Sequence, residues 1–162
     1  MCMILASFYQ KMMAVPADRR GGGTIPNEIG IFTKLTGLNV GTLIGSKINL
    51  FVSIARLSAN TFHLVGDDRT KLYGTLPTEL GTLTQLNYLD LRNNTISGSI
   101  PSEIGLLTQL TYLELSGNIL SGTIPSEIGL LTQLTYMNVK DNGLDGTIPS
   151  EIGDLTQLTF LI

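Results

Sequence analysis

One segment of 24 residues recurs in register through the second half of the chain. Gly98–Ser121 reads GSIPSEIGLLTQLTYLELSGNILS, and Gly122–Asp145 repeats it almost letter for letter. Gly74–Ser97 is a related copy, and Gly146–Ile162 is a shortened one. A fixed period of roughly 20–50 residues is typical of a solenoid, in which each turn stacks on the next. Because no turn can bury its apolar residues alone, this period constrains the architecture more than any local propensity does.

Apolar residues return at the same positions of every unit. In the copy that begins at Gly98, the recurring residues are Leu107, Leu110, Leu113, Leu115, Asn118, Leu120, Gly122, Ile124, Pro125, Ile128 and Gly129. Leu113 and Leu115 alternate with period two, which predicts a short half-buried strand. Since this strand recurs in each unit, the sequence predicts one parallel sheet in which Leu89, Leu113 and Met137 are stacked.

An asparagine follows each predicted strand at a fixed distance. Asn94, Asn118 and Asn142 stand where the backbone bends away from the sheet. An amide carries both a donor and an acceptor, so it can bond unpaired main-chain groups of adjacent turns. We therefore predict a structural ladder of asparagines.

The chain divides into a regular part and an irregular part. Residues 74–162 form four units, at 74–97, 98–121, 122–145 and 146–162, and the last of these is truncated. Because the chain stops inside a predicted strand, we expect it to be a fragment of a longer repeat protein.

The first 73 residues follow the period less closely. Residues 1–22 are predicted to be irregular or disordered, since the apolar run after Met1 is short for a signal peptide and no basic residue precedes it. Residues 23–40 match the unit in part and predict a divergent first repeat. At 41–73 the register fails, so this segment is either a degenerate repeat with an insertion or lies outside the solenoid. The apolar spacing of Ile48, Phe51, Val52, Ile54 and Ala55 allows a short amphipathic helix there.

Charge and composition exclude several classes of function. Residues 74–162 carry two Lys/Arg against nine Asp/Glu, so the repeats lack the basic surface that nucleic-acid binding needs. No uninterrupted apolar stretch is long enough to span a membrane. His63 is the only histidine and Cys2 the only cysteine, and neither stands in a catalytic or metal-binding motif. We therefore expect no catalysis, metal or cofactor.

The aligned pattern L-x-x-L-x-x-L-x-L-x-x-N-x-L-x-G-x-I-P-x-x-I-G-x resembles the plant-type leucine-rich repeat, closely over 74–162 and partially over 23–40. The resemblance implies an α/β fold: a curved right-handed solenoid with a parallel sheet of short strands on its concave face. It also implies binding of a protein or peptide, often as the ligand-recognition region of a receptor-like protein or receptor kinase. An extracellular or membrane-associated parent protein is favoured over a cytoplasmic one. The paired cysteines that usually flank the end caps of secreted members, and a kinase segment, are both missing.

Outward strand positions are the candidate recognition face, because several of them change between otherwise near-identical copies. Tyrosines offer rigid amphipathic contact area there. An equally weighted alternative is that duplication left matching tyrosines that simply cover the strand edges. The predicted partner-binding residues are Tyr88, Asp90, Arg92, Tyr112, Glu114, Ser116, Tyr136, Asn138, Lys140 and Phe160.

Regular polar columns supply the remaining candidates. Threonine columns, such as Thr111 with Thr135 and Thr159, suggest an alternative function as a glycan- or ice-binding surface. The column of Glu79, Glu103, Glu127 and Glu151 provides one carboxylate per turn, which predicts a solvated face rather than a metal site. Asn93 begins an Asn-Asn-Thr sequon, a possible glycosylation site if the chain is secreted.

Overall fold

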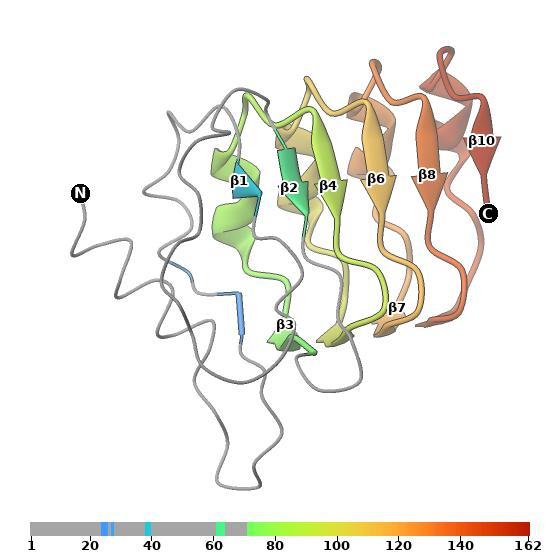
Figure 1. Ribbon diagram of the computed structural model, residues 1–162. Coiled ribbons are helices and arrows are strands. Elements are labelled where there is room, and N and C mark those ends of the chain that lie inside the picture. The colour runs from blue at the N-terminus through green and yellow to red at the C-terminus, as the bar shows by residue number, and fades with distance from the viewer. Residues whose placement is uncertain (1–23, 26, 28–37, 40–60, 64–70) are drawn as a thin grey trace, which may run out of the picture.

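The computed structural model describes residues 24, 25, 27, 38–39, 61–63 and 71–162, and they build a solenoid (Figure 1). Two parallel sheets run along it, one of six strands in the order β1-β2-β4-β6-β8-β10 and one of four in the order β3-β5-β7-β9. The short helix that the sequence allows within residues 48–55 lies outside the described residues.

Each turn of the solenoid is called a rung below, and four of the described rungs contribute one strand to each sheet and one 3-10 helix. The larger sheet contains β1 (Leu38–Asn39), β2 (Thr61–His63), β4 (Tyr88–Asp90), β6 (Tyr112–Glu114), β8 (Tyr136–Asn138) and β10 (Phe160–Leu161). The smaller sheet contains β3 (Tyr73–Thr75), β5 (Thr95–Gly98), β7 (Ile119–Gly122) and β9 (Gly143–Leu144). The helices are η3 (Thr78–Thr82), η4 (Ser102–Leu106), η5 (Ser126–Leu130) and η6 (Ser150–Asp154).

The register of the larger sheet follows the sequence period. Leu89 pairs with Leu113, and Leu113 pairs with Met137, so the predicted stacking of these three residues in one parallel sheet is confirmed. The pairing of Phe62 with Leu89 spans 27 positions instead of 24, which places the three extra residues of the irregular part between β2 and β4. β2 lies within 41–73 and pairs with both β1 and β4, so this strand occupies a rung. The domain boundaries themselves stay a prediction.

The segment after each asparagine forms the smaller sheet, which the sequence pattern did not predict. The chain leaves these strands towards the next helix; Gly98 and Gly122 end β5 and β7, Gly146 follows β9 by two residues, and Gly74 lies within β3. Gly98, Gly122 and Gly146 have φ of 73°, 73° and 79°, in the left-handed region where a side chain would be strained. The recurring glycine is therefore a requirement of the turn.

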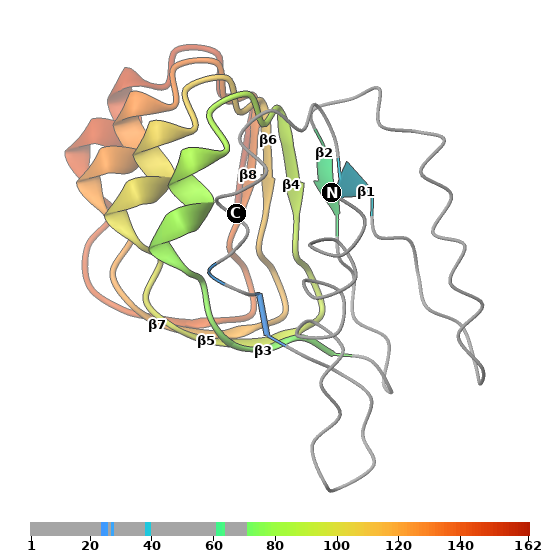
Figure 2. The ribbon, with the colours of Figure 1, turned by 90° about the vertical axis from the view of Figure 1, so that its left-hand side faces the viewer.

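The helices pack on the side of each rung opposite the larger sheet, as the view along the solenoid shows (Figure 2). Proline stands immediately before each helix in an extended conformation, and the main-chain N–H of Ile104 donates to the carbonyl of Pro101 at 3.0 Å. Neighbouring helices approach closely at Gly105, where a Cβ atom would lie only 2.6 Å from the carbonyl oxygen of Glu127. Glycine is thus needed for the rungs to stack.

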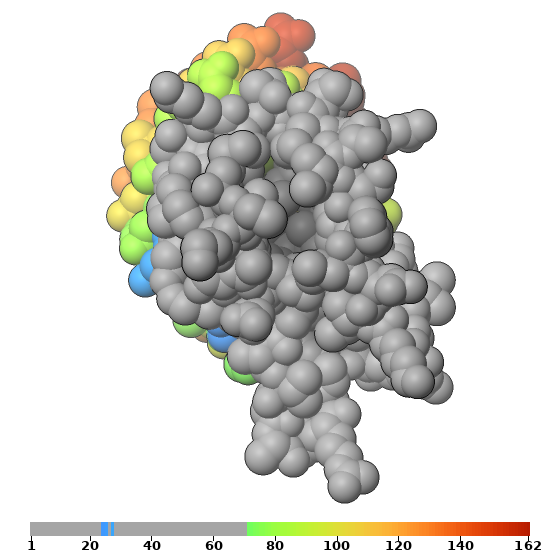
Figure 3. All heavy atoms as spheres, turned by 60° about the vertical axis from the view of Figure 1, so that its left-hand side comes forward, coloured from blue at the N-terminus to red at the C-terminus, as the bar shows by residue number. Residues whose placement is uncertain are grey.

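The hydrophobic core fills the space between the larger sheet and the helices. Leu89, Leu113 and Met137 are completely buried, and so are Leu107 and Leu131 beneath the helices. Each such side chain contributes roughly 1.5–3 kcal/mol of transfer free energy. In the space-filling view the rungs follow one another in chain order, from green to red, along the edge of the molecule (Figure 3). Each inner rung is therefore covered by its sequence neighbours.

Candidate functional site

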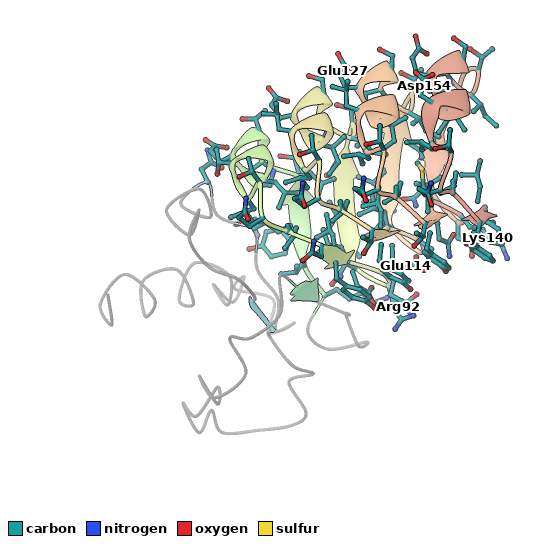
Figure 4. All side chains as sticks on the ribbon, turned by 90° about the horizontal axis from the view of Figure 1, so that it is seen from above. Arg92, Glu114, Glu127, Lys140 and Asp154 are labelled. Carbon is teal, nitrogen blue, oxygen red and sulfur yellow. The ribbon has the colours of Figure 1, made fainter. Side chains whose placement is uncertain are left out.

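The larger sheet exposes one side to solvent, which we call the strand face. Of the ten predicted partner-binding residues, seven come from β4, β6, β8 and β10, and Arg92, Ser116 and Lys140 each stand two positions after the end of β4, β6 or β8. Arg92, Glu114 and Lys140 lie on this side of the ribbon, whereas Glu127 and Asp154 lie on the opposite, helical side (Figure 4). The periodic spacing thus brings the predicted residues together on one surface.

An aromatic column runs along the strand face. Neighbouring rings of Tyr88, Tyr112, Tyr136 and Phe160 are stacked, with centroids 4.2, 4.3 and 4.4 Å apart and planes within 8° of parallel. Such offset or parallel contacts between rings stabilise neighbouring rungs. Because ring faces cover one another, a partner would meet mainly the ring edges and the hydroxyl groups.

The hydroxyl groups of this column are weak acids. Burial raises the pKa of Tyr112 to about 12, and the neighbouring Tyr88 hydroxyl acts in the same direction. Burial likewise raises the pKa of Tyr136 to about 12, since the phenolate would lose water. The Glu114 carboxylate adds to this shift, because it accepts a hydrogen bond from the Tyr136 hydroxyl at 2.9 Å and would repel the phenolate. Both groups are neutral over the physiological pH range.

The acidic residues beside the tyrosines, Asp90 and Glu114, are among the predicted partner-binding residues, and both are buried. Asp90 is 0% exposed and Glu114 is 2% exposed. Glu114 accepts hydrogen bonds from the Ser116 main chain at 3.0 Å, from the Tyr136 hydroxyl and from the Asn138 amide at 3.1 Å. Neighbouring side chains cover both carboxylates. Asp90 and Glu114 therefore contribute negative charge to the strand face but offer a partner little contact area.

The next column differs from rung to rung. The Arg92 guanidinium, with 42% of the side chain exposed, lies 3.3 Å from the carboxylate of Asp90. At the equivalent position of the next rung stands the half-buried Ser116, and after it the exposed Lys140. Neither the Ser116 hydroxyl nor the Lys140 ammonium bonds to any residue that the structure describes. This column therefore has unused hydrogen-bonding and ionic capacity.

The three asparagines connect rungs inside the solenoid. The Asn118 amide oxygen accepts from the main-chain N–H of Ile96 at 3.0 Å, and its amide nitrogen donates to the carbonyls of Leu91 and Leu115, each at 2.9 Å. Asn142 makes the same contacts one rung later. Asn94 accepts from Leu72 at 2.9 Å and donates to Leu91 at 2.8 Å. These amides satisfy main-chain groups at the bend, and so they are structural rather than available to a partner.

Comparison with known proteins agrees with this geometry. A family model described as a leucine-rich repeat region matches residues 64–162, which is more than half of the chain. The chain belongs to the leucine-rich repeat family. Among curated protein sequences, no match to it is found.

Several solved plant receptor structures share this leucine-rich repeat fold. The ectodomain of the Arabidopsis thaliana membrane receptor kinase GASSHO1/SCHENGEN3, in complex with CASPARIAN STRIP INTEGRITY FACTOR 2, is 31% identical over 85% of this chain and 13% of that one, with a TM-score of 0.66. The ectodomain of the Arabidopsis thaliana receptor kinase SOBIR1 is 27% identical over 88% of this chain and 62% of that one, with a TM-score of 0.65. The plant peptide hormone receptor RGFR1, in complex with RGF2, is 35% identical over 65% of this chain and 16% of that one, with a TM-score of 0.60.

These comparisons confirm the right-handed solenoid with its parallel sheet on the concave face. The chain spans less than two thirds of the length of each receptor chain named above. Within the described part of this leucine-rich repeat, no helix has both the length and the apolar character needed to cross a membrane.

The helical face of the leucine-rich repeat carries the remaining candidates. Its glutamates each accept a hydrogen bond from the preceding hydroxyl, as Glu127 does from Ser126 at 3.4 Å. No group of three or more His, Cys, Asp or Glu residues that could hold a metal ion occurs in the described part of the chain. On the other side, the hydroxyls of Thr111, Thr135 and Thr159 donate to main-chain carbonyls of the preceding rung, each at 2.9 Å. These threonines therefore have no free donor with which to build an ordered hydroxyl array.

Proposed function

We propose that the chain is a non-catalytic module that binds a peptide or an extended protein segment across the strand face. The concave sheet of a solenoid presents side chains from several rungs to one ligand. Two of the similar receptors were solved in complex with CASPARIAN STRIP INTEGRITY FACTOR 2 and with RGF2, which supports this class of ligand.

One observation carries the proposal. The segment from Ile100 to Tyr112 is identical to that from Ile124 to Tyr136, and the changes on the sheet begin immediately afterwards. On the strand face, Glu114 is replaced by Asn138 and Ser116 by Lys140. The two rungs therefore share the sequence of the helix and of the segment that leads into the sheet, while their strands present different charges. A surface whose charges differ between rungs of one repeated scaffold is suited to distinguishing ligands of different sequence.

Peptide selection with matched charge reversals tests the location of binding. A library of random twelve-residue peptides is selected on the full chain, and the affinity of the selected peptides is then measured for four variants. We expect Arg92→Glu and Lys140→Glu on the strand face to weaken binding by about tenfold or more, the scale of one charge-assisted contact. Glu127→Lys and Asp154→Lys, on the helical face, are the matched controls and should leave binding unchanged.

The opposite pattern would reject the proposal. If the selected peptides lose affinity only for Glu127→Lys and Asp154→Lys, then the helical face is the binding surface. Circular dichroism of each variant distinguishes a local effect from unfolding. A glycan array probed with the same chain tests the alternative of glycan binding, and a specific glycan with no selected peptide would favour that alternative.

We further propose that the parent protein is extracellular or membrane-associated and that Asn93 carries an N-linked glycan. Asn93 is exposed and begins a sequon at the edge of the strand face. Expression through a eukaryotic secretory pathway should give a mass that falls on treatment with a peptide N-glycosidase. Asn93→Gln is the control, and an unmodified mass for the secreted wild-type chain would contradict the assignment.

A further inference from the structure

We propose that Asn142 and Gly143 form a site at which the chain modifies itself. The Asn142 side chain deamidates when its rung opens, and the product weakens the contact between that rung and the preceding one. We call these two residues the deamidation site. The inference concerns hydrogen bonds inside the solenoid, so it does not depend on the proposed binding of a peptide.

The residue after each asparagine of the ladder differs from rung to rung. Thr95 follows the first asparagine, Ile119 the second and Gly143 the third, which gives the only Asn-Gly pair in the sequence. Deamidation begins when the main-chain nitrogen of the following residue attacks the side-chain amide carbon. A β-branched side chain hinders that approach, whereas glycine has no Cβ and adopts many more backbone conformations. The sequence of the ladder therefore singles out Asn142.

The reaction needs no reagent other than water. The main-chain nitrogen of Gly143 forms a bond to Cγ of Asn142, the bond from Cγ to Nδ2 breaks, and the amide group leaves as ammonia with the proton from Gly143. Water then opens the cyclic imide at one of its carbonyl groups. Opening at the main-chain carbonyl gives isoaspartate, which adds a methylene group to the main chain, and opening at the other gives aspartate.

The closed rung holds the Asn142 amide in place. Its oxygen accepts a hydrogen bond from the main-chain N–H of Leu120 at 3.0 Å. Its nitrogen donates to the carbonyls of Leu115 and Val139, each at 3.0 Å, and of Lys140 at 3.2 Å. Because attack changes the geometry at Cγ and releases Nδ2, these bonds must break first. The ladder thus protects its own asparagine while the rung stays closed.

This rung opens more easily than the ones before it. Asn94 is 4% exposed and Asn118 is 6% exposed, whereas Asn142 is half-buried and Gly143 is exposed. Among the described strands, β7 pairs on both sides, but β9 has only two residues and pairs with β7 alone. Fewer hydrogen bonds therefore need to break to release Asn142.

The product cannot replace the bonds that the amide made. A carboxylate accepts hydrogen bonds but donates none, so the carbonyls of Leu115, Val139 and Lys140 lose their side-chain donor and face a negative charge. Isoaspartate also lengthens the main chain just before β9, which shifts this strand out of register with β7. Deamidation is therefore expected to keep the rung from closing again as before.

Peptide mapping of an incubated sample tests the site. The full chain, produced in bacteria so that no glycan is attached, is kept folded in mildly alkaline buffer and then digested with trypsin, which cleaves after lysine and arginine. The digest contains the peptides 93–140 and 141–162, and Asn142 is the only asparagine of the second. We expect the mass gain of deamidation to accumulate in 141–162 at least about tenfold faster, which corresponds to a barrier lower by about 1.4 kcal/mol.

A sample digested without incubation gives the background of this measurement. Equal rates in the two peptides, or no mass gain in 141–162 above the background, would overturn the proposal. A parallel incubation in urea tests the protection by the ladder. The rate at Asn142 should rise by about tenfold or more when the chain is unfolded, because the bonds that hold its amide are then broken. Equal rates in the folded and unfolded chains would contradict the gating.

Two variants separate the effect of glycine from that of the rung. Gly143→Ala places a Cβ 3.1 Å from the carbonyl oxygen of Leu120, which a small shift relieves, and should slow the modification by about tenfold. Ile119→Gly creates a second Asn-Gly pair, at Asn118 in a covered rung, and removes a side chain that is 59% exposed. Asn118 should then deamidate more slowly than Asn142. Equal rates at the two pairs would show that the rung does not control the reaction.

A further variant tests the consequence of the modification. Asn142→Asp reproduces the aspartate product and should lower the Tm by about 2 °C or more. Gln157→Glu makes the same change from amide to carboxylate at an exposed position and should leave the Tm unchanged. Differential scanning calorimetry measures both. An unchanged Tm in Asn142→Asp would contradict the proposed weakening of the rung.

Discussion

The rung that begins at Gly98 and the one that begins at Gly146 have almost the same sequence but different surroundings. Both contain the segment IPSEIG, yet its first residue is 3% exposed as Ile100 and 67% exposed as Ile148. On the sheet, Leu113 is completely buried, whereas Leu161 is 40% exposed. The same residue is thus core in one rung and surface in the other. Stability in this molecule belongs to the interface between rungs rather than to each repeat by itself.

The largest expected effect concerns the buried leucines of the sheet. Leu113→Ala leaves a cavity between two rungs and should lower the free energy of unfolding by about 3–4 kcal/mol. Leu161→Ala removes the same atoms from a site that water already reaches, and should cost less than about 1 kcal/mol. Urea unfolding followed by circular dichroism measures both. Equal losses would show that burial by the neighbouring rung does not decide the contribution.

A second pair of variants compares the asparagine ladder at two places. Asn118→Ala leaves one N–H and two carbonyls of the bend without their side-chain partner, which should cost about 3 kcal/mol in unfolding free energy. Asn142→Ala breaks equivalent bonds in a half-buried site, where water can replace part of the loss, and its cost should be smaller. A larger loss for Asn142→Ala than for Asn118→Ala would contradict this view.

A third pair tests the contact between helices. In Gly105→Ala the new Cβ would lie 2.6 Å from the carbonyl oxygen of Glu127, so the rungs must separate and stability should fall by about 1–3 kcal/mol. Gly153→Ala meets no atom within 4 Å and should change stability by less than about 0.5 kcal/mol. Differential scanning calorimetry compares the two Tm values. A neutral Gly105→Ala would mean that adjacent helices are not held at this distance.

The smallest expected effect is the pH dependence of the tyrosine column. The folded state raises the pKa of Tyr112 and Tyr136 from 10.0 to about 12, so it favours their neutral forms. Their contribution to stability is therefore complete below pH 10 and is lost as the pH rises from 10 towards 12. Unfolding free energies measured across this range should fall, and phenolate absorbance should rise near the upper end.

Glu114→Gln serves as the control for that titration. It removes a charge that bonds to the Tyr136 hydroxyl and that has less influence on Tyr112. The pKa of Tyr136 should therefore fall more than that of Tyr112. Equal changes in the two phenols would contradict the assigned hydrogen bond.

The repeat period was sufficient to predict the fold and the grouping of the candidate residues. Because Leu89, Leu113 and Met137 are spaced by one period, their stacking in a parallel sheet followed from the sequence, and the structure confirms it. The smaller sheet was not predicted, since short segments such as Ile119–Gly122 lack alternating apolar residues. Its strands depend on main-chain hydrogen bonds to the neighbouring rung, and such bonds produce no recognisable pattern in the local amino-acid sequence.

The burial of the acidic residues could not be read from the sequence either. Strand alternation places Asp90 and Glu114 on the outer side of the sheet, which is where the structure has them. Their exposure, however, depends on the lengths of neighbouring side chains and on bonds from the Ser116 main chain and the Tyr136 hydroxyl. These contacts join residues of different rungs and different positions, so a column-by-column alignment does not reveal them.

The stacked rings give the strand face an optical signal of its own. The chain has no tryptophan, and three of its five tyrosines, Tyr88, Tyr112 and Tyr136, stand in that one column. Intrinsic ultraviolet emission therefore originates largely from the surface where a ligand is proposed to bind. Contact with a peptide, or separation of adjacent rungs, would change that emission without any added label.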